Sequence, residues 1–317
     1  MSHDFKTYKE QIQILKNRHL YIDDEDFAID FLQKNNYYNV INGYKDLFIE
    51  DKENPSDDDV YIEGSKFKEI CSLYLFDREL RITTLNYIII FENTLKSIFS
   101  YHFSKIYRDK YAYLDIENFN PQKKKDTMEQ FSRITKEISN KISKSAPIKH
   151  YIEKEKEIPL WVLVNYLTLG NISHLYDVLK IEEQNTICNY FLDNFANEYN
   201  RDRDELNAID SIDFKNIIKI TNLMRNICAH DERLYNSKLK RIDLRKIYNL
   251  FHINYINLKN YYSLLVCLHF VLPKMEFQKL LDDIKKLYST YEGKFKTFTI
   301  SKLKSVSGIE EGNLFNL

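Results

Sequence analysis

Apolar residues recur every three or four positions along most of the chain, which is the spacing of amphipathic α-helices rather than strands. The longest such run starts at Lys66 and continues past Leu95 to Ile106, and it predicts one long helix. A second run begins near Asp213 and forms one apolar stripe at Ile217, Ile220, Met224, Ile227 and Cys228. Stretches that alternate like a β-strand are few. The pattern therefore predicts an all-α protein.

Shorter helices are predicted on both sides of these runs. Ile12 and Leu15 face inward in one of them, and Asp23, Asp24 and Glu25 have the pattern of the cap and acidic first turn of the next. Only 6 Gly and 5 Pro interrupt the pattern, which also favours long helices. We expect an N-terminal helical extension over residues 1–58, a helical domain over 59–272, and a C-terminal helical segment and tail over 273–317.

The middle of the chain carries two further predictions. Pro159 and Gly170 flank an apolar run and predict a helix that starts near the proline and ends at the glycine. Trp161, the single tryptophan of the chain, lies in this run and is expected in the core. Residues 136–156 are rich in lysine and are expected to form a loop, either a charged solvated surface or a candidate RNA contact.

Composition and charge describe an ordinary globular protein. Hydrophobic residues make up 44% of the 317 residues and charged residues 29%, with a formal net charge of −1. This balance gives no overall attraction to nucleic acid, so any RNA contact must come from a local patch. The longest apolar run, residues 261–272, is too short to span a bilayer and predicts a buried helix. We expect a cytoplasmic protein without a membrane partner.

The four cysteines lie far apart and form no C-x-x-C pair: Cys71, Cys188, Cys228 and Cys267. They are expected to be buried reduced thiols rather than a zinc site or a disulfide framework. The sequence also has no phosphate-binding glycine loop and no H-E-x-x-H pattern. We therefore expect no metal and no cofactor.

The helix that begins near Asp213 ends in a polar set that a core does not need. Asn226 and His230 are one turn apart, and Arg225 points about 100° to one side of Asn226. Histidine exchanges protons near neutral pH, and arginine offers a fork of donors to phosphate oxygens. These side chains suit RNA cleavage in which the substrate's own 2′-hydroxyl is the nucleophile and no metal is required.

Each of these residues also has a structural interpretation. Arg225 can pair with a nearby carboxylate, and His230 can cap the last carbonyls of a helix. The candidate RNA contacts are Arg78, Arg81, Arg233, Tyr235 and Asn236. Arg78 and Arg81 either line a cleft or form ion pairs with the acidic residues beside them. Tyr235 and Asn236 either stack on a base or cap the helix end.

Five separated blocks of the sequence carry a resemblance to a known family. In chain order they are Tyr8–Lys16 with Ile22–Asp24, Asn42–Tyr44 with Leu47–Phe48, Leu75–Arg81, Pro159–Gly170, and Arg225–Asn226 with Ala229–His230 and Arg233–Asn236. Together, over roughly residues 8–270, these blocks resemble the Abi-like abortive-infection family of bacteria, in the AbiD/AbiF group.

The resemblance implies a HEPN-like helical bundle whose Arg-polar-x-x-x-His motif is associated with metal-independent ribonuclease activity. It implies that Arg225, Asn226 and His230 are the catalytic residues. It also implies a phage-defence or toxin role in which RNA cleavage arrests the host cell, and a small noncoding antitoxin RNA as a partner. Relatives of this kind usually pair two motifs across a dimer, and this chain has one copy, so we expect a homodimer with a shared cleft.

One position departs from the family pattern. Many relatives have a second histidine directly after the motif histidine, and here that position is Asp231. A carboxylate there favours protonated His230 if the two side chains approach, and it repels phosphate. Two other hypotheses stay open: a HEPN-type protein that holds a small noncoding RNA without cutting it, and a purely structural helical adaptor.

Overall fold

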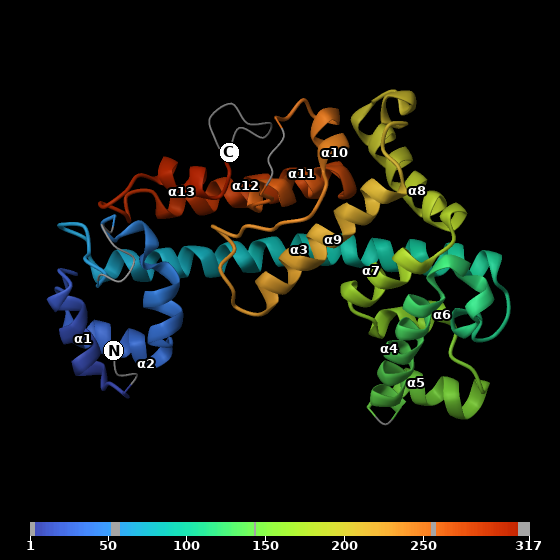
Figure 1. Ribbon diagram of the computed structural model, residues 1–317, viewed down its shortest axis with the longest axis horizontal. Helices are drawn as coiled ribbons and strands as arrows, with labels where there is room; N and C mark the ends of the chain where they lie inside the picture. Colours follow the sequence, from blue (N-terminus) through green and yellow to red (C-terminus); the bar gives the residue numbers. More distant parts are fainter. Residues whose placement is uncertain (1–3, 52–57, 143, 255–257, 310–317) are drawn as a thin grey trace. The chain divides into compact units, whose positions relative to one another are not determined.

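The structure, a computed structural model, describes residues 4–51, 58–142, 144–254 and 258–309 (Figure 1). Within these ranges the chain is helical and contains no β-strand, only isolated bridges such as Ile49 with Tyr61. The all-α prediction is confirmed. The chain divides into two compact units, the first formed by Met1–Thr83, His230–Ser237 and Leu281–Leu317, and the second by Thr84–Ala229 and Lys238–Leu280. The predicted division at residues 58 and 272 stays a prediction.

The long helix α3 runs from Phe67 to Ile106, as the apolar spacing predicts (Figure 1). In the first unit it is joined by α1, α2 and α13, which span Tyr8–Asn17, Glu25–Lys34 and Ile300–Val306. The part of α12 (Lys274–Tyr291) from Leu281 onward also belongs to this unit. A π-helical turn at Tyr38–Asn42 and a 3-10 turn at Lys45–Leu47 connect α2 to the segment before α3.

The start of each N-terminal helix is fixed by its own sequence. Thr7 and Glu10 form a reciprocal capping box at the start of α1. Asp24, the middle residue of the predicted acidic start at positions 23–25, caps α2 by accepting a hydrogen bond from the backbone N–H of Phe27 at 2.9 Å. Ile12 and Leu15 are buried, which confirms the inward face of α1.

The second unit is built around α9, which spans Ser211–Ala229 and packs against α7, α8 and α11. Its predicted stripe is buried at Ile217, Ile220, Met224 and Cys228, while Ile227 is half-buried. Besides α3 from Thr84 onward and α12 up to Leu280, this unit contains α4 at Lys124–Ile142, α5 at Ala146–His150, α6 at Leu160–Leu163, α7 at Leu169–Val178, α8 at Ile181–Tyr199, α10 at Arg245–Leu250 and α11 at Tyr261–Val271.

Two predictions around α6 are wrong. Gly170 does not end a helix but is the second residue of α7, because Thr168 and Asn171 form a capping box that starts a new helix there. Trp161 is not in the core, because the residue is 58% exposed. It is the second residue of the four-residue helix α6, whose buried face is formed by Leu160 and Leu163.

The structure also tests the predictions for the cysteines, for the apolar run at residues 261–272 and for the lysine-rich residues 136–156. All four cysteines are buried and unbridged, as predicted, and burial raises the pKa of the Cys188 thiol to about 12. The predicted buried helix at residues 261–272 is α11. The predicted lysine-rich loop at residues 136–156 is mostly helical in its described part, because α4, α5 and a π-helical turn occupy it. Across the described ranges, every helix is too short or too polar to cross a membrane.

The imidazole of His269, on α11, lies between two aromatic rings. Its centroid is 4.8 Å from that of Phe251 and 4.6 Å from that of Phe277. Burial lowers the pKa of His269 to about 4. The unfolded chain therefore takes up this proton at a higher pH than the folded chain does. The contribution of this histidine to the free energy of unfolding is therefore fully present above about pH 6.5, and it is lost as the pH falls towards about 4.

We expect this one group to lower the free energy of unfolding by about 2 kcal/mol between about pH 7.5 and about pH 5. Urea unfolding of the wild type and of His269→Phe at both pH values measures the effect, because the variant keeps an aromatic ring but cannot be protonated. The variant should lose that part of the pH dependence. An equal drop in both proteins would show that His269 is not responsible.

Candidate active site at the end of helix α9

Arg225 and Asn226 lie in the last turns of α9, and His230 follows the last helical residue, Ala229. The Arg225 side chain is 30% exposed, Asn226 is half-buried, and His230 is exposed in the turn that leaves the helix. The predicted position of the motif at a helix end is confirmed. That Asn226 and His230 share a face stays a prediction, since the helix stops before His230.

Arg225 has a carboxylate nearby but does not form a close pair with it. Its Nε lies 3.8 Å from Oε2 of Glu92 on α3, and this buried Nε has no hydrogen-bond partner in the described part of the chain. The other carboxylate oxygen of Glu92 pairs with Lys96 at 2.6 Å. Glu92 therefore forms its close ion pair with Lys96, and its interaction with Arg225 is the weaker of the two. The guanidinium keeps donors that can bind a phosphate.

Asn222 is a further polar residue of α9 that the sequence analysis did not single out. It lies four residues before Asn226, so the two amides share one face of the helix. A Cβ atom on Gly170 would lie 3.5 Å from Oδ1 of Asn222, which means that the first turn of α7 lies directly beside this face. The i, i+4 spacing of two asparagines was the signal that could have found it.

In the first unit, the segment that follows the motif is tied to α3 by one buried carboxylate. Asp77 Oδ1 accepts a hydrogen bond from the backbone N–H of Tyr235 at 2.8 Å, and Oδ2 accepts one from that of Leu234 at 3.1 Å. The Tyr44 hydroxyl donates to Oδ2 at 2.8 Å, and Arg81 donates to it at 2.8 Å. Full burial raises the pKa of the Asp77 carboxyl, and Arg81 and these hydrogen bonds oppose that rise.

Arg81 links this cluster to the residue after the motif histidine. Its side chain is 3% exposed, and its second terminal nitrogen pairs with the carboxylate of Asp231. Arg81 also donates to the backbone carbonyl of Glu232 at 3.3 Å. The charge of Asp231 is thus compensated by a guanidinium 150 residues away in the sequence. This pairing weakens the repulsion of phosphate that the sequence led us to expect at Asp231.

The other candidate RNA contacts have different surroundings. Arg233 donates to the carbonyl of Gly43 at 2.7 Å and pairs with Asp46 at 2.8 Å. Tyr235 is fully buried, and its ring stacks on that of Tyr44 with centroids 5.9 Å apart. These contacts, like those of Arg81, give the residues structural roles, while their contacts with RNA stay predictions.

Arg78 is exposed on α3, and Asn236 is half-buried in the turn after Tyr235, so Arg78 is the most accessible of the five candidate RNA contacts. In the ranges that the structure describes, no three His, Cys, Asp or Glu side chains are grouped where they would hold a metal ion.

Three of the five sequence blocks therefore meet around Asp77: Asn42–Tyr44, Leu75–Arg81 and Arg233–Asn236. The fold and the site define an all-helical protein in which an Arg-Asn-x-x-x-His sequence lies at the end of a helix. The buried carboxylate of Asp77 and its hydrogen-bond partners hold the segment that follows this sequence. A family model described as Abi-like protein matches residues 30–236, more than half of the 317 residues, and the chain belongs to this family. Comparison with curated proteins and with solved structures found no match.

Proposed function

We propose that the protein is a metal-independent endoribonuclease of the HEPN type, acting in the bacterial cytoplasm in phage defence or in a toxin–antitoxin system. Membership of the Abi-like family suggests a role in abortive infection. The observation that carries the proposal is the end of α9. Arg225, whose guanidinium is only loosely paired, and the exposed His230 lie within six consecutive residues there.

The proposed reaction uses the ribose of the substrate. His230 accepts the proton of the 2′-hydroxyl as its oxygen forms a bond to the adjacent phosphorus. The bond from phosphorus to the 5′-oxygen of the next nucleotide breaks, and a general acid protonates that oxygen. Arg225 stabilises the additional negative charge on the phosphate, and Asn226 orients the imidazole or binds the phosphate. The products are a 2′,3′-cyclic phosphate and a 5′-hydroxyl.

A single motif supplies one histidine, whereas in-line cleavage needs a base and an acid on opposite sides of the phosphate. A two-fold homodimer provides the second histidine from a second copy of the chain. We therefore expect the protein to sediment with twice the chain mass of 38.2 kDa under assay conditions. A protein that is monomeric at every concentration at which it cuts RNA would contradict the composite site.

The proposed function is tested by purifying the protein from its native host and sequencing the RNA that accompanies it, with the His230→Ala variant beside it. We expect the wild type to cleave cellular RNA in EDTA and the variant to retain bound RNA intact. The alternative, a HEPN-type protein that holds a small noncoding RNA without cutting it, predicts bound RNA with both proteins and cleavage with neither.

A further inference from the structure

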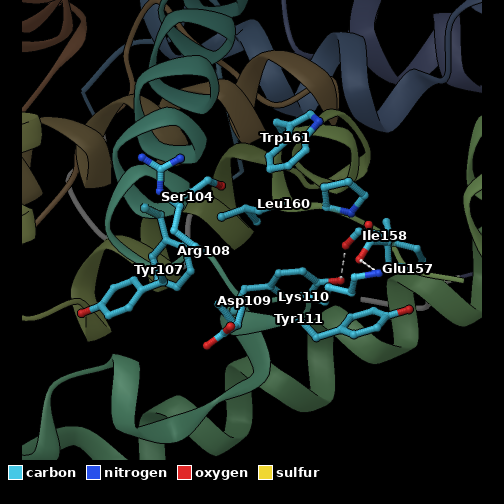
Figure 2. Close-up of a pocket in the computed structure, with 14 residues that line it drawn as sticks. Ser104, Tyr107, Arg108, Asp109, Lys110, Tyr111, Glu157, Ile158, Leu160 and Trp161 are labelled. Carbon is cyan, nitrogen blue, oxygen red and sulfur yellow. Dashed lines mark hydrogen bonds and ion pairs between the residues drawn. The ribbon is translucent and has the colours of Figure 1, made fainter. Parts of the chain in front are cut away.

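The second unit contains a pocket of about 270 Å³ that the proposed reaction does not use. It lies between the end of α3, the turn that follows it, and the segment entering α6 (Figure 2). The volumes of ligand pockets usually range upward from about 300 Å³, so this pocket has room for about one nucleotide and not for a longer stretch of RNA. Figure 2 shows the exposed Trp161 and the Arg108 side chain at its rim, with Lys110, Tyr111 and Glu157 on the other walls.

The backbone around this pocket is held in an unusual conformation. Tyr111 has φ +60° and Lys156 has φ +61°, in the left-handed region that residues other than glycine and asparagine rarely adopt. The Tyr113 hydroxyl donates to the carbonyl of Ile158 at 2.9 Å. The Tyr111 hydroxyl donates a longer hydrogen bond, of 3.5 Å, to the backbone carbonyl of Lys156. These contacts fasten the two walls together, so the pocket is formed before any ligand arrives.

The pocket is lined by two cations, Arg108 and Lys110, and by two carboxylates, Asp109 and Glu157, which are not all paired with one another. Lys110 pairs with Glu157 at 2.9 Å. Arg108 follows the end of α3, and in the described part of the chain it bonds only through Nε, which donates to the Lys105 carbonyl in the last turn of α3 at 3.1 Å. Its two terminal nitrogens keep their donors for a ligand, and their planar fork fits phosphate oxygens.

Trp161 adds the second half of a nucleotide site. A tryptophan that is 58% exposed beside a pocket leaves aromatic surface in water, and such a surface stacks on bases of any sequence. A free guanidinium and an exposed indole on the same pocket match the phosphate and the base of one nucleotide. We propose that this pocket binds one nucleotide of a single-stranded RNA, with Trp161 stacking on the base and Arg108 binding the phosphate.

This site deepens the proposed function, on which it rests for the identity of its ligand, and lies outside the Arg225–His230 motif. It serves to hold the RNA, and Arg108 and Trp161 take no part in the bond cleavage. Because Trp161 is the only tryptophan of the chain, its fluorescence reports on this pocket without a label.

The experiment uses the full-length His230→Ala protein, so that the RNA stays intact, and titrates it with a labelled single-stranded polyadenylate of about ten nucleotides. We expect saturable quenching of Trp161 fluorescence that follows the RNA binding measured by anisotropy. Arg108→Ala and Trp161→Ala should each weaken binding by about tenfold, and Trp161→Phe should restore most of it. Lys125→Ala, which removes an exposed charge on α4, should change binding by less than about twofold.

Three results would overturn the inference. The first is RNA binding by anisotropy with unchanged Trp161 fluorescence, which would place the RNA elsewhere. The second is quenching by a phosphopeptide of matched charge but not by the RNA. The third is conversion of a dimer to a monomer by Trp161→Ala, which would make the indole an interface residue. Since RNA cleavage by the wild type is measured separately, each of these results leaves the proposed ribonuclease activity standing.

Discussion

Replacing His230 with alanine should reduce RNA cleavage by at least about 100-fold, because a positioned acid or base contributes about 10²- to 10⁴-fold. Arg225→Ala should reduce it by about the same factor, since it removes the charge that stabilises the developing negative phosphate. The measurement is the initial rate of RNA cleavage in EDTA with equal amounts of folded protein. Growth arrest on expression in bacteria should be lost in parallel.

The matched control is Lys238→Ala, a cation removed from an exposed position eight residues after His230. It should keep the cleavage rate within about twofold, because exposed charges away from a site contribute little. His230 is itself exposed, so its loss should leave the unfolding curve unchanged within about 0.5 kcal/mol. Retained cleavage in both His230→Ala and Arg225→Ala would refute their catalytic roles.

The largest expected effect on stability comes from Asp77. Asp77→Ala removes the acceptor for two buried backbone N–H groups and leaves the Arg81 guanidinium, which is 3% exposed, without its buried partner. Breaking one side of a buried ion pair costs about 3–5 kcal/mol. We expect a loss of that size in the free energy of unfolding, measured in urea, and weaker anchoring of residues 230–237.

A loss of this size approaches the whole stability of many domains, so a milder variant accompanies it. Asp77→Asn keeps the shape and one acceptor oxygen, and should cost about 2 kcal/mol. Arg78→Ala, the next residue on α3 and an exposed one, should stay within about 0.5 kcal/mol of the wild type. If Asp77→Ala were as stable as Arg78→Ala, the cluster would not be holding the segment after the motif.

Local chemistry explains which parts of the fold were visible in the sequence. A capping residue acts on neighbours within three positions, so the acidic residues at positions 23–25 could predict the start of α2. The continuous apolar spacing of residues 66–106 likewise gave α3 its length. Gly170 misled the prediction because glycine is common after helices, whereas here Thr168 and Asn171, on either side of it, form a capping box that starts α7.

The candidate site was only partly predictable, for a different reason. Arg225 and His230 could be found as candidates because only four residues separate them in the sequence and because the chemistry depends on residue type. The partner of Asp231, by contrast, is Arg81, and no periodic pattern links positions 150 residues apart. The exposure of Trp161 was equally hidden, since apolar neighbours in the sequence predict burial and only packing decides which side of a short helix faces water.

The chemistry of the cut ends shows whether the 2′-hydroxyl of the substrate is the nucleophile. Cellular RNA is incubated in EDTA with the wild type, the cleavage site is mapped, and an oligonucleotide with that site is made with and without the 2′-hydroxyl at the cut nucleotide. We expect a 2′,3′-cyclic phosphate, a 5′-hydroxyl, and no cleavage of the 2′-deoxy substrate. Cleavage of the 2′-deoxy substrate, or products that end in a 3′-hydroxyl and a 5′-phosphate, would contradict this mechanism.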